Sequence, residues 1–174
     1  RDAQESRGLG DVYKRQIVRC DKRILGIHDL VVHDYGPGRL MVSLHAEVPY
    51  KEDILELHDL IDQIEFSLRK ELNCEPVIHM DPIVDDDEET NAAKARITEI
   101  IESLNKDSRK NEKVQFHDFR MVKGSTHSNL IFDVVLPHGY QMSEEQIISY
   151  IKEKVSEYNK NYYCVIHIDR AYVK

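Results

Sequence analysis

Histidine and carboxylate residues recur in the same pattern in two parts of this sequence, and these side chains have the clearest potential for chemistry. The string His-Met-Asp-Pro at His79–Pro82 returns as His-Ile-Asp-Arg at His167–Arg170. A His-Asp pair precedes each string, at His28-Asp29 and at His117-Asp118. Imidazole nitrogens and carboxylate oxygens together suit Zn²⁺ and neighbouring divalent ions. The repetition predicts two copies of one module, each built around a metal site or its remnant.

Five side chains of the first copy are candidate ligands, although any one histidine, taken singly, is more often an ordinary surface or core residue. In a β-strand, residues two apart face the same way, so His79 and Asp81 form a ready chelating pair. By the same alternation His28 shares a face with Leu30 and Val32, which leaves its exposure open. The candidate ligands are His28, His45, His58, His79 and Asp81.

The elements that must position these residues follow the order strand, strand, helix, strand. The predicted ranges are Leu25–Asp34, Leu40–Val48, Lys51–Leu72 and Val77–Asp81. The second strand alternates strictly, which places His45 on the face opposite the apolar set. The helix carries one apolar stripe with His58 at its edge. Because proline donates no backbone hydrogen bond, we expect Pro82 to end the last strand.

The second copy repeats this order after a helix of its own. Its predicted elements are Ala92–Leu104, Val114–Val122, Leu130–Leu136, Ser143–Tyr158 and Tyr163–Asp169. Both copies are therefore expected to be α+β, with an antiparallel sheet that carries helices on one face. The domain prediction is a first copy at 17–83 whose opening helix is truncated, an acidic linker at 84–91 and a divergent second copy at 92–174.

The first sixteen residues, RDAQESRGLGDVYKRQ, show neither a helical nor a strand period. They resemble translated sequencing-adaptor read-through, and segment 1–16 is predicted to be non-native. A native flexible N-terminus is the alternative.

Composition narrows the function classes. The chain has 174 residues and a formal net charge of −8, which argues against nucleic-acid phosphates as a partner. No apolar run approaches the roughly 18 residues of a membrane helix. Three scattered cysteines are too few for a disulfide framework or a zinc ribbon, and reduced thiols in a cytosolic setting are expected.

Five short motifs occur in order in the first copy. They are Gly26–Leu30, Gly36–Arg39, Leu44–Glu47, His58–Glu65 and Ile78–Pro82. Together they resemble the cytosolic C-terminal domain of the cation diffusion facilitator family, over about Ile17–Ile83. That family consists of membrane exporters of Zn²⁺ and related ions that are driven by proton exchange. The resemblance implies a ferredoxin-like, metallochaperone-like α+β module that forms homodimers and binds metal at or near the dimer interface.

The resemblance also implies roles for particular residues. The family's ligand positions fall on the five candidate ligands of the first copy, and all five are ligand-type side chains. In the second copy Asp133 takes the place of His45, and the place of His58 falls near Ser149. The second set is therefore His117, Asp133, His167 and Asp169, which we interpret as an altered, weaker or vestigial site more than as a fully functional one.

Three functions follow from these observations. The leading hypothesis is the regulatory and dimerisation domain of a Zn²⁺ or related cation exporter, on the cytoplasmic face of the membrane, whose membrane domain lies outside this chain. The alternative is a free-standing cytosolic metal-binding or metallochaperone-like protein. A metal-dependent hydrolase would need an open coordination position and a general base, and no separate motif indicates them, so an enzyme is not expected. The mixed face that carries Met41, Ser43, His45 and Glu47 is expected to meet either the second copy or a second chain.

Overall fold

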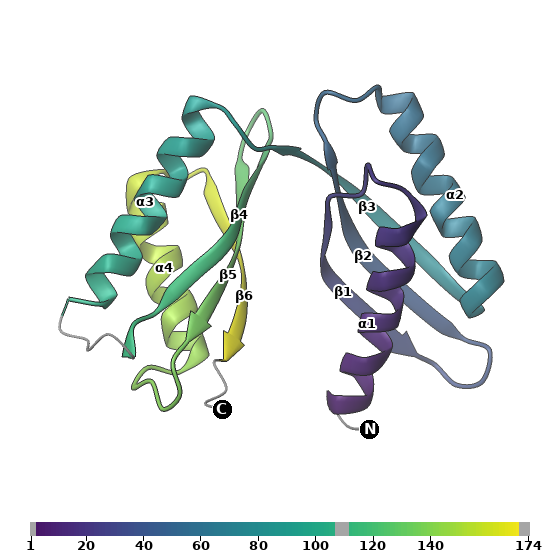
Figure 1. Cartoon of the computed structure of the whole chain (residues 1–174), viewed down its shortest axis with the longest axis horizontal. Helices are drawn as coiled ribbons and strands as arrows, with labels where there is room; N and C mark the ends of the chain where they lie inside the picture. The colour runs from purple at the N-terminus through teal and green to yellow at the C-terminus, as the bar shows by residue number, and fades with distance from the viewer. Residues whose placement is uncertain (1–2, 107–111, 171–174) are drawn as a thin grey trace. The chain divides into compact units, whose positions relative to one another are not determined.

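A computed structural model describes residues 3–106 and 112–170 of the chain. The chain divides into two compact units, Arg1–Ile83 and Val84–Lys174 (Figure 1). Each unit has the element order helix, strand, strand, helix, strand. The predicted α+β class is confirmed, and so is the prediction that the two copies share one topology.

The first unit contains a three-stranded sheet with β2 at its centre. Its elements are α1 (Ala3–Cys20), β1 (Gly26–Asp34), β2 (Leu40–Pro49), α2 (Ile54–Leu72) and β3 (Cys74–Val84). Strand β2 pairs antiparallel with β1 and parallel with β3. The sheet is thus mixed, and the expectation of a wholly antiparallel sheet is wrong. The reason is the α2 crossover, which returns the chain in the direction of β2.

Both helices of the first unit pack on the same face of this sheet (Figure 1). The core joins side chains of α1 and α2 to the inward residues of the strands, among them Tyr13, Ile17, Leu44, Ile64 and Leu68. Helix α2 begins cleanly because the Asp53 side chain accepts hydrogen bonds from the backbone of Leu55 and Glu56. The other face of the sheet, which we call the open face, is left to His45 and its neighbours.

The second unit repeats the first. Its elements are α3 (Glu88–Leu104), β4 (Gln115–Lys123), β5 (Ser128–Leu136), α4 (Glu144–Tyr158) and β6 (Tyr162–Arg170). Strand β5 is central, antiparallel to β4 and parallel to β6. Helix α4 starts with a capping box between Ser143 and Gln146. A separate apolar core lies between α3, α4 and one face of this sheet.

A bulge interrupts the first strand of each unit at the same place. The register shifts between His28 and Val31 in β1 and between His117 and Arg120 in β4. The residue after each histidine has positive φ, 51° at Asp29 and 56° at Asp118. The extra residue reverses the alternation, so His28 faces away from Leu30 and Val32 and not with them. This corrects the face predicted for His28.

Three boundary predictions need correction. Helix α1 runs through most of segment 1–16, where no periodicity was found, because Tyr13 and Ile17 are four residues apart and both enter the core. Helix α3 begins at Glu88 inside the predicted linker, with Asp87 as its N-cap. Strand β3 continues through Pro82, since the extended backbone of a strand tolerates a proline whose N–H is not needed. The non-native origin of 1–16 stays a prediction.

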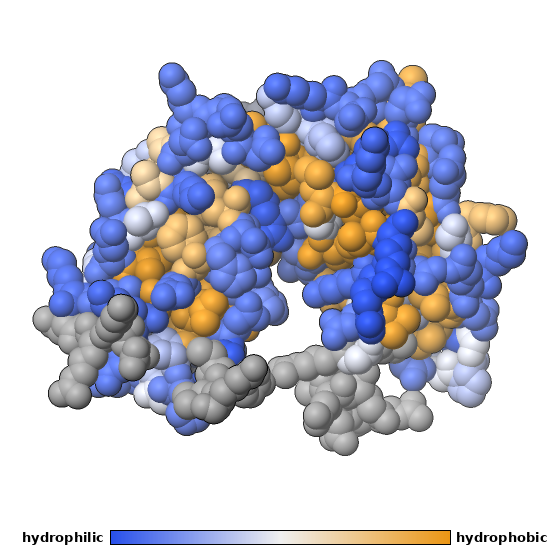
Figure 2. All heavy atoms as spheres, in the orientation of Figure 1, coloured by the Kyte–Doolittle hydropathy of each residue, from blue (hydrophilic) through white to orange (hydrophobic). Residues whose placement is uncertain are grey.

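Polar and charged side chains cover most of the visible surface, with smaller hydrophobic areas between them (Figure 2). In the described ranges, no helix is both long enough and apolar enough to cross a membrane.

Candidate metal centre

Three histidines of the first unit lie in one row across its sheet. His28 of β1 is in register with His45 of β2, which is in register with His79 of β3. The imidazole centroids are 4.8 Å apart for the first pair and 4.7 Å apart for the second. Asp81 lies two residues beyond His79 on the same strand face. The topology therefore gathers residues from three separate parts of the chain on the open face.

The carboxylate of Asp81 joins the three imidazoles. Its Oδ2 atom is 2.8 Å from Nδ1 of His45 and 3.0 Å from Nε2 of His28. Its Oδ1 atom is 3.2 Å from Nε2 of His79. The carboxylate itself is nearly buried, with 7% of its side chain exposed, whereas His79 is 67% exposed. We call His28, His45, His79 and Asp81 the first cluster; His79 is its most exposed member, and the Asp81 carboxylate is buried.

Glu47 contacts the first cluster through His28, and the sequence alone did not assign Glu47 a ligand or supporting role. Its Oε2 atom is 3.2 Å from Nδ1 of His28, and the side chain is almost wholly buried. It lies two residues after His45 on the outward face of β2, in register with Asp81. The alternation had already placed it on that face, and an acidic residue beside a predicted ligand was the available signal. Contacts of this kind orient a ligating histidine.

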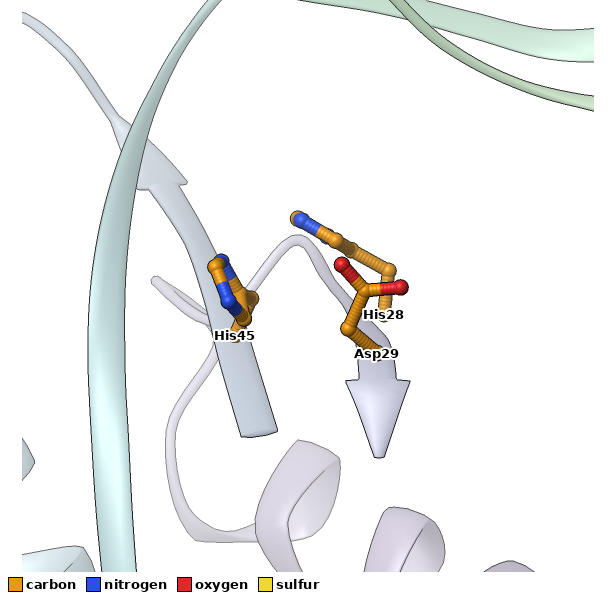
Figure 3. Close-up of side chains that lie close together, drawn as sticks. All are labelled: His28, Asp29 and His45. Carbon is orange, nitrogen blue, oxygen red and sulfur yellow. The ribbon is translucent and has the colours of Figure 1, made fainter. Parts of the chain in front are cut away.

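Asp29 is a second residue that the sequence analysis left out of the ligand set. His28, Asp29 and His45 can each offer a ligand atom within 4.8 Å of the others. Figure 3 shows His28 and Asp29 together on β1 beside His45 on β2. His45, His79 and Asp81 form a second such group, so His45 is common to both. The repeated His-Asp pair was the signal for Asp29, and the bulge explains how its carboxylate reaches the same side as His28.

The electrostatics favour positive charge at this site. Burial disfavours the charged form of His28, but hydrogen bonds to Asp81 and Glu47 outweigh it and raise its pKa to about 9. Burial likewise opposes the charge of Asp81, and the hydrogen bonds from His28 and His45 nevertheless lower its pKa. Two buried carboxylates thus hold a proton on His28, and a divalent cation in the same place would meet the same field.

His58 is not brought to the first cluster. It lies on α2, which packs on the opposite face of the sheet, and its side chain is 72% exposed. Its Nδ1 atom is 3.6 Å from Oδ2 of Asp62, one helical turn away. It is exposed enough for a partner to reach, and its role as a ligand stays a prediction.

The second unit carries an equivalent row. His117 of β4 is in register with Asp133 of β5, which is in register with His167 of β6. His167 Nδ1 is 3.3 Å from Asp169 Oδ1, and His117 lies 3.7 Å from each of Asp133 and Asp169. The alignment that put Asp133 in the place of His45 is therefore matched by the strand register. With Asp118 of the bulge, 3.0 Å from His117, these residues form the second cluster: His117, Asp118, Asp133, His167 and Asp169.

The donor sets of both clusters fit a divalent transition-metal ion. Each unit offers two groups of three residues, and within each group the imidazole nitrogens and carboxylate oxygens lie within 4.8 Å of one another, as a small coordination sphere requires. In the first unit His28, His45, His79 and Asp81 would hold such an ion, and Asp29 lies near His28 and His45. The bound ion would supply a fixed positive charge that ties three strands together.

Comparison with known proteins finds a family match for the first unit. Residues 14–83 match the family described as cation efflux protein, cytoplasmic domain, which is named for dimerisation and is a transporter domain and not an enzyme class. A curated relative, the uncharacterized transporter MJ0449 of Methanocaldococcus jannaschii, is 34% identical over 76 residues. That match covers 43% of this chain and 26% of the relative, so the chain spans about a quarter of that transporter.

Two solved structures of CzrB, described as a candidate zinc transporter, are also similar. The zinc form is 24% identical with a TM-score of 0.39, covering 47% of this chain and 89% of CzrB. The other is 25% identical with a TM-score of 0.39, covering 47% of this chain and 96% of CzrB. The family match, the motifs and the topology together support a cytoplasmic domain of the cation diffusion facilitator type over residues 14–83.

Proposed function

We propose that the first unit is a metal-responsive regulatory and dimerisation domain of an exporter of Zn²⁺ or a related divalent ion. The observation that supports this most strongly is the row of three histidines closed by the buried carboxylate of Asp81. A histidine-rich set with one or two carboxylates is typical of Zn²⁺ and its neighbours and not of Mg²⁺ or Ca²⁺. Export itself, by proton exchange, would belong to a membrane domain outside this chain.

The open face offers a reason for association. Three apolar side chains are exposed on it: Val31 at 43%, Met41 at 45% and Val77 at 58%. Val31, Ser43 and Val77 lie in one register row, two residues along β2 from the histidine row. Burying such side chains against a second chain is favourable by about 25 cal/mol for each Å² removed from water. A dimer through this face would also enclose the cluster.

Metal would act by favouring one arrangement of the subunits. An ion held by the first cluster lies on the open face, so it can accept a further ligand from a neighbouring chain that docks on that face. Binding then stabilises the associated state by the difference in affinity between the two states. The exporter would in this way sense the ion that it transports.

Analytical ultracentrifugation of the chain, with Zn²⁺ and with a chelator, tests this function. We expect Zn²⁺ to increase the dimer fraction and the double variant His79→Ala/Asp81→Ala to abolish the increase. The matched control is His167→Ala/Asp169→Ala, which removes the equivalent pair of the second unit. A monomer under both conditions would contradict the dimerisation role and favour pairing of the two copies within one chain.

A further inference from the structure

The second cluster differs from the first at two equivalent positions of the central strand. Asp133 occupies the register position of His45, between His117 and His167. Val135 is in register with Asp169, where the first unit has Glu47 in register with Asp81. The second unit therefore has a carboxylate where the first has the imidazole of His45. It also has Val135 where the first has Glu47, the buried acid that contacts His28.

The second cluster nevertheless keeps the geometry of a ligand set. Asp133, His167 and Asp169 offer atoms within 4.8 Å of one another, and so do His117, Asp118 and Asp133. Asp133 belongs to both groups, as His45 does in the first unit. A carboxylate has two oxygens and can serve both groups at once, whereas a neutral imidazole has a single acceptor nitrogen.

We propose that the second unit holds its own divalent-cation site and that its preference is shifted toward oxygen-seeking ions such as Mn²⁺. Its donors are two imidazoles and three carboxylates, against three imidazoles and two carboxylates when Asp29 is counted in the first unit. Carboxylate ligands suit Mn²⁺, and imidazole ligands suit Zn²⁺. Any such site still binds Zn²⁺ more tightly than Mn²⁺, so the proposed shift is in the ratio of the Zn²⁺ affinity to the Mn²⁺ affinity.

The two sites also differ in how far their carboxylate side chains are exposed to solvent. The side chains of Asp81 and Glu47 are 7% and 3% exposed, whereas those of Asp133 and Asp169 are 23% and 43% exposed. Water can therefore complete the coordination of an ion at the second cluster, which is how hard divalent ions are commonly held. The first site is less exposed to water and has more imidazole ligands. Two copies of one fold would then respond to different ions.

Electron paramagnetic resonance of Mn²⁺ tests this site in the full chain. The signal of free Mn²⁺ falls on binding, and a background of His79→Ala/Asp81→Ala removes the first cluster. We expect that background to bind Mn²⁺ and to lose the binding when His167→Ala/Asp169→Ala is added. Because the first cluster is absent from both samples, the result is separate from the function proposed for the first unit.

The single variant Asp133→His tests the selectivity. In the same background it should raise the ratio of Zn²⁺ to Mn²⁺ affinity by roughly tenfold, the size of effect that ligand-environment changes commonly give. Circular dichroism checks folding, and Asp133→Asn, which keeps the size of the side chain, should weaken Mn²⁺ binding without disturbing the sheet. Mn²⁺ binding that survives His167→Ala/Asp169→Ala, or an unchanged ratio in Asp133→His, would overturn the proposal.

Discussion

At the scale of single residues, Asp81 connects the three imidazoles of the first cluster and Glu47 holds His28 from the other side. Sequence reasoning found Asp81 and the three histidines because strand alternation and a repeated motif are visible in one dimension. It did not find the roles of Glu47 and Asp29. Those depend on the register between strands and on a bulge, and neither can be read from the spacing along one strand.

The pKa of His28 makes the stability of the metal-free chain depend on pH. The folded pKa of about 9 is above the ordinary value of 6.5, so the stabilisation is fully present below about pH 6.5 and is lost as pH rises through about 9. The shift corresponds to at most roughly 3 kcal/mol. Urea unfolding with chelator at pH 6.5 and pH 9.5 should show this loss, and His28→Gln should reduce it. An equal loss in His28→Gln and in the exposed control His33→Gln would contradict the assignment.

Glu47→Gln should weaken Zn²⁺ binding by about 10-fold to 100-fold, because the neutral amide no longer fixes the tautomer and charge of His28. Competition against a chromophoric chelator measures the affinity. Glu75→Gln removes an exposed carboxylate from β3 and is the matched control, expected to leave the affinity unchanged. Equal affinities for both variants would show that Glu47 does not support the site.

At the scale of elements, the bulges in β1 and β4 place His28 and His117 on the same sheet face as the other residues of their clusters. The strands, hairpins and helices were predicted close to their observed ranges because their apolar periods are strong. Helix α1 was missed because, among its residues whose burial is described, Tyr13 and Ile17 alone are buried. Pro82 was predicted to end β3 because proline donates no backbone hydrogen bond. That rule fails where the neighbouring strand does not need the N–H group at that position.

The positive φ of Asp29 and Asp118 gives a backbone prediction. A β-branched side chain is strained in this region, so Asp29→Val should cost about 1–3 kcal/mol of unfolding free energy. Asp29→Gly relieves the strain and is the control that keeps the bulge while removing the carboxylate. Chemical denaturation should show a large loss for valine and little loss for glycine. Asp118→Val should behave as Asp29→Val does, and equal stability of the valine and glycine variants would contradict the bulge.

At the scale of the whole molecule, the chain joins two units of one topology with different donor sets. The repeat could be predicted because its motif and its element order both recur. The exposure of His58 on the far side of the sheet could not, since a helical period places a residue on a stripe but does not say which face of the sheet the helix covers.

His58→Ala should leave both Zn²⁺ binding to the first cluster and Zn²⁺-dependent dimerisation through the open face largely intact. The reason is that His58 lies on α2, on the other face of the sheet, apart from that cluster. Sedimentation with Zn²⁺ measures the dimer fraction, and His138→Ala, an exposed histidine of the second unit, is the control. A loss of dimerisation in His58→Ala that His138→Ala does not show would contradict a dimer through the open face.

The central claim is that the first cluster binds a divalent ion. Calorimetric titration of the whole chain with Zn²⁺ tests it most directly, comparing the unaltered protein with His79→Ala/Asp81→Ala and with the matched variant His167→Ala/Asp169→Ala. We predict that the first double variant loses the tightest Zn²⁺ site while the second retains it. This binding should weaken as pH falls, because protons compete with the ion for the histidine ligands, first for His28 with its pKa of about 9. Tight binding that persists unchanged in His79→Ala/Asp81→Ala would contradict the claim.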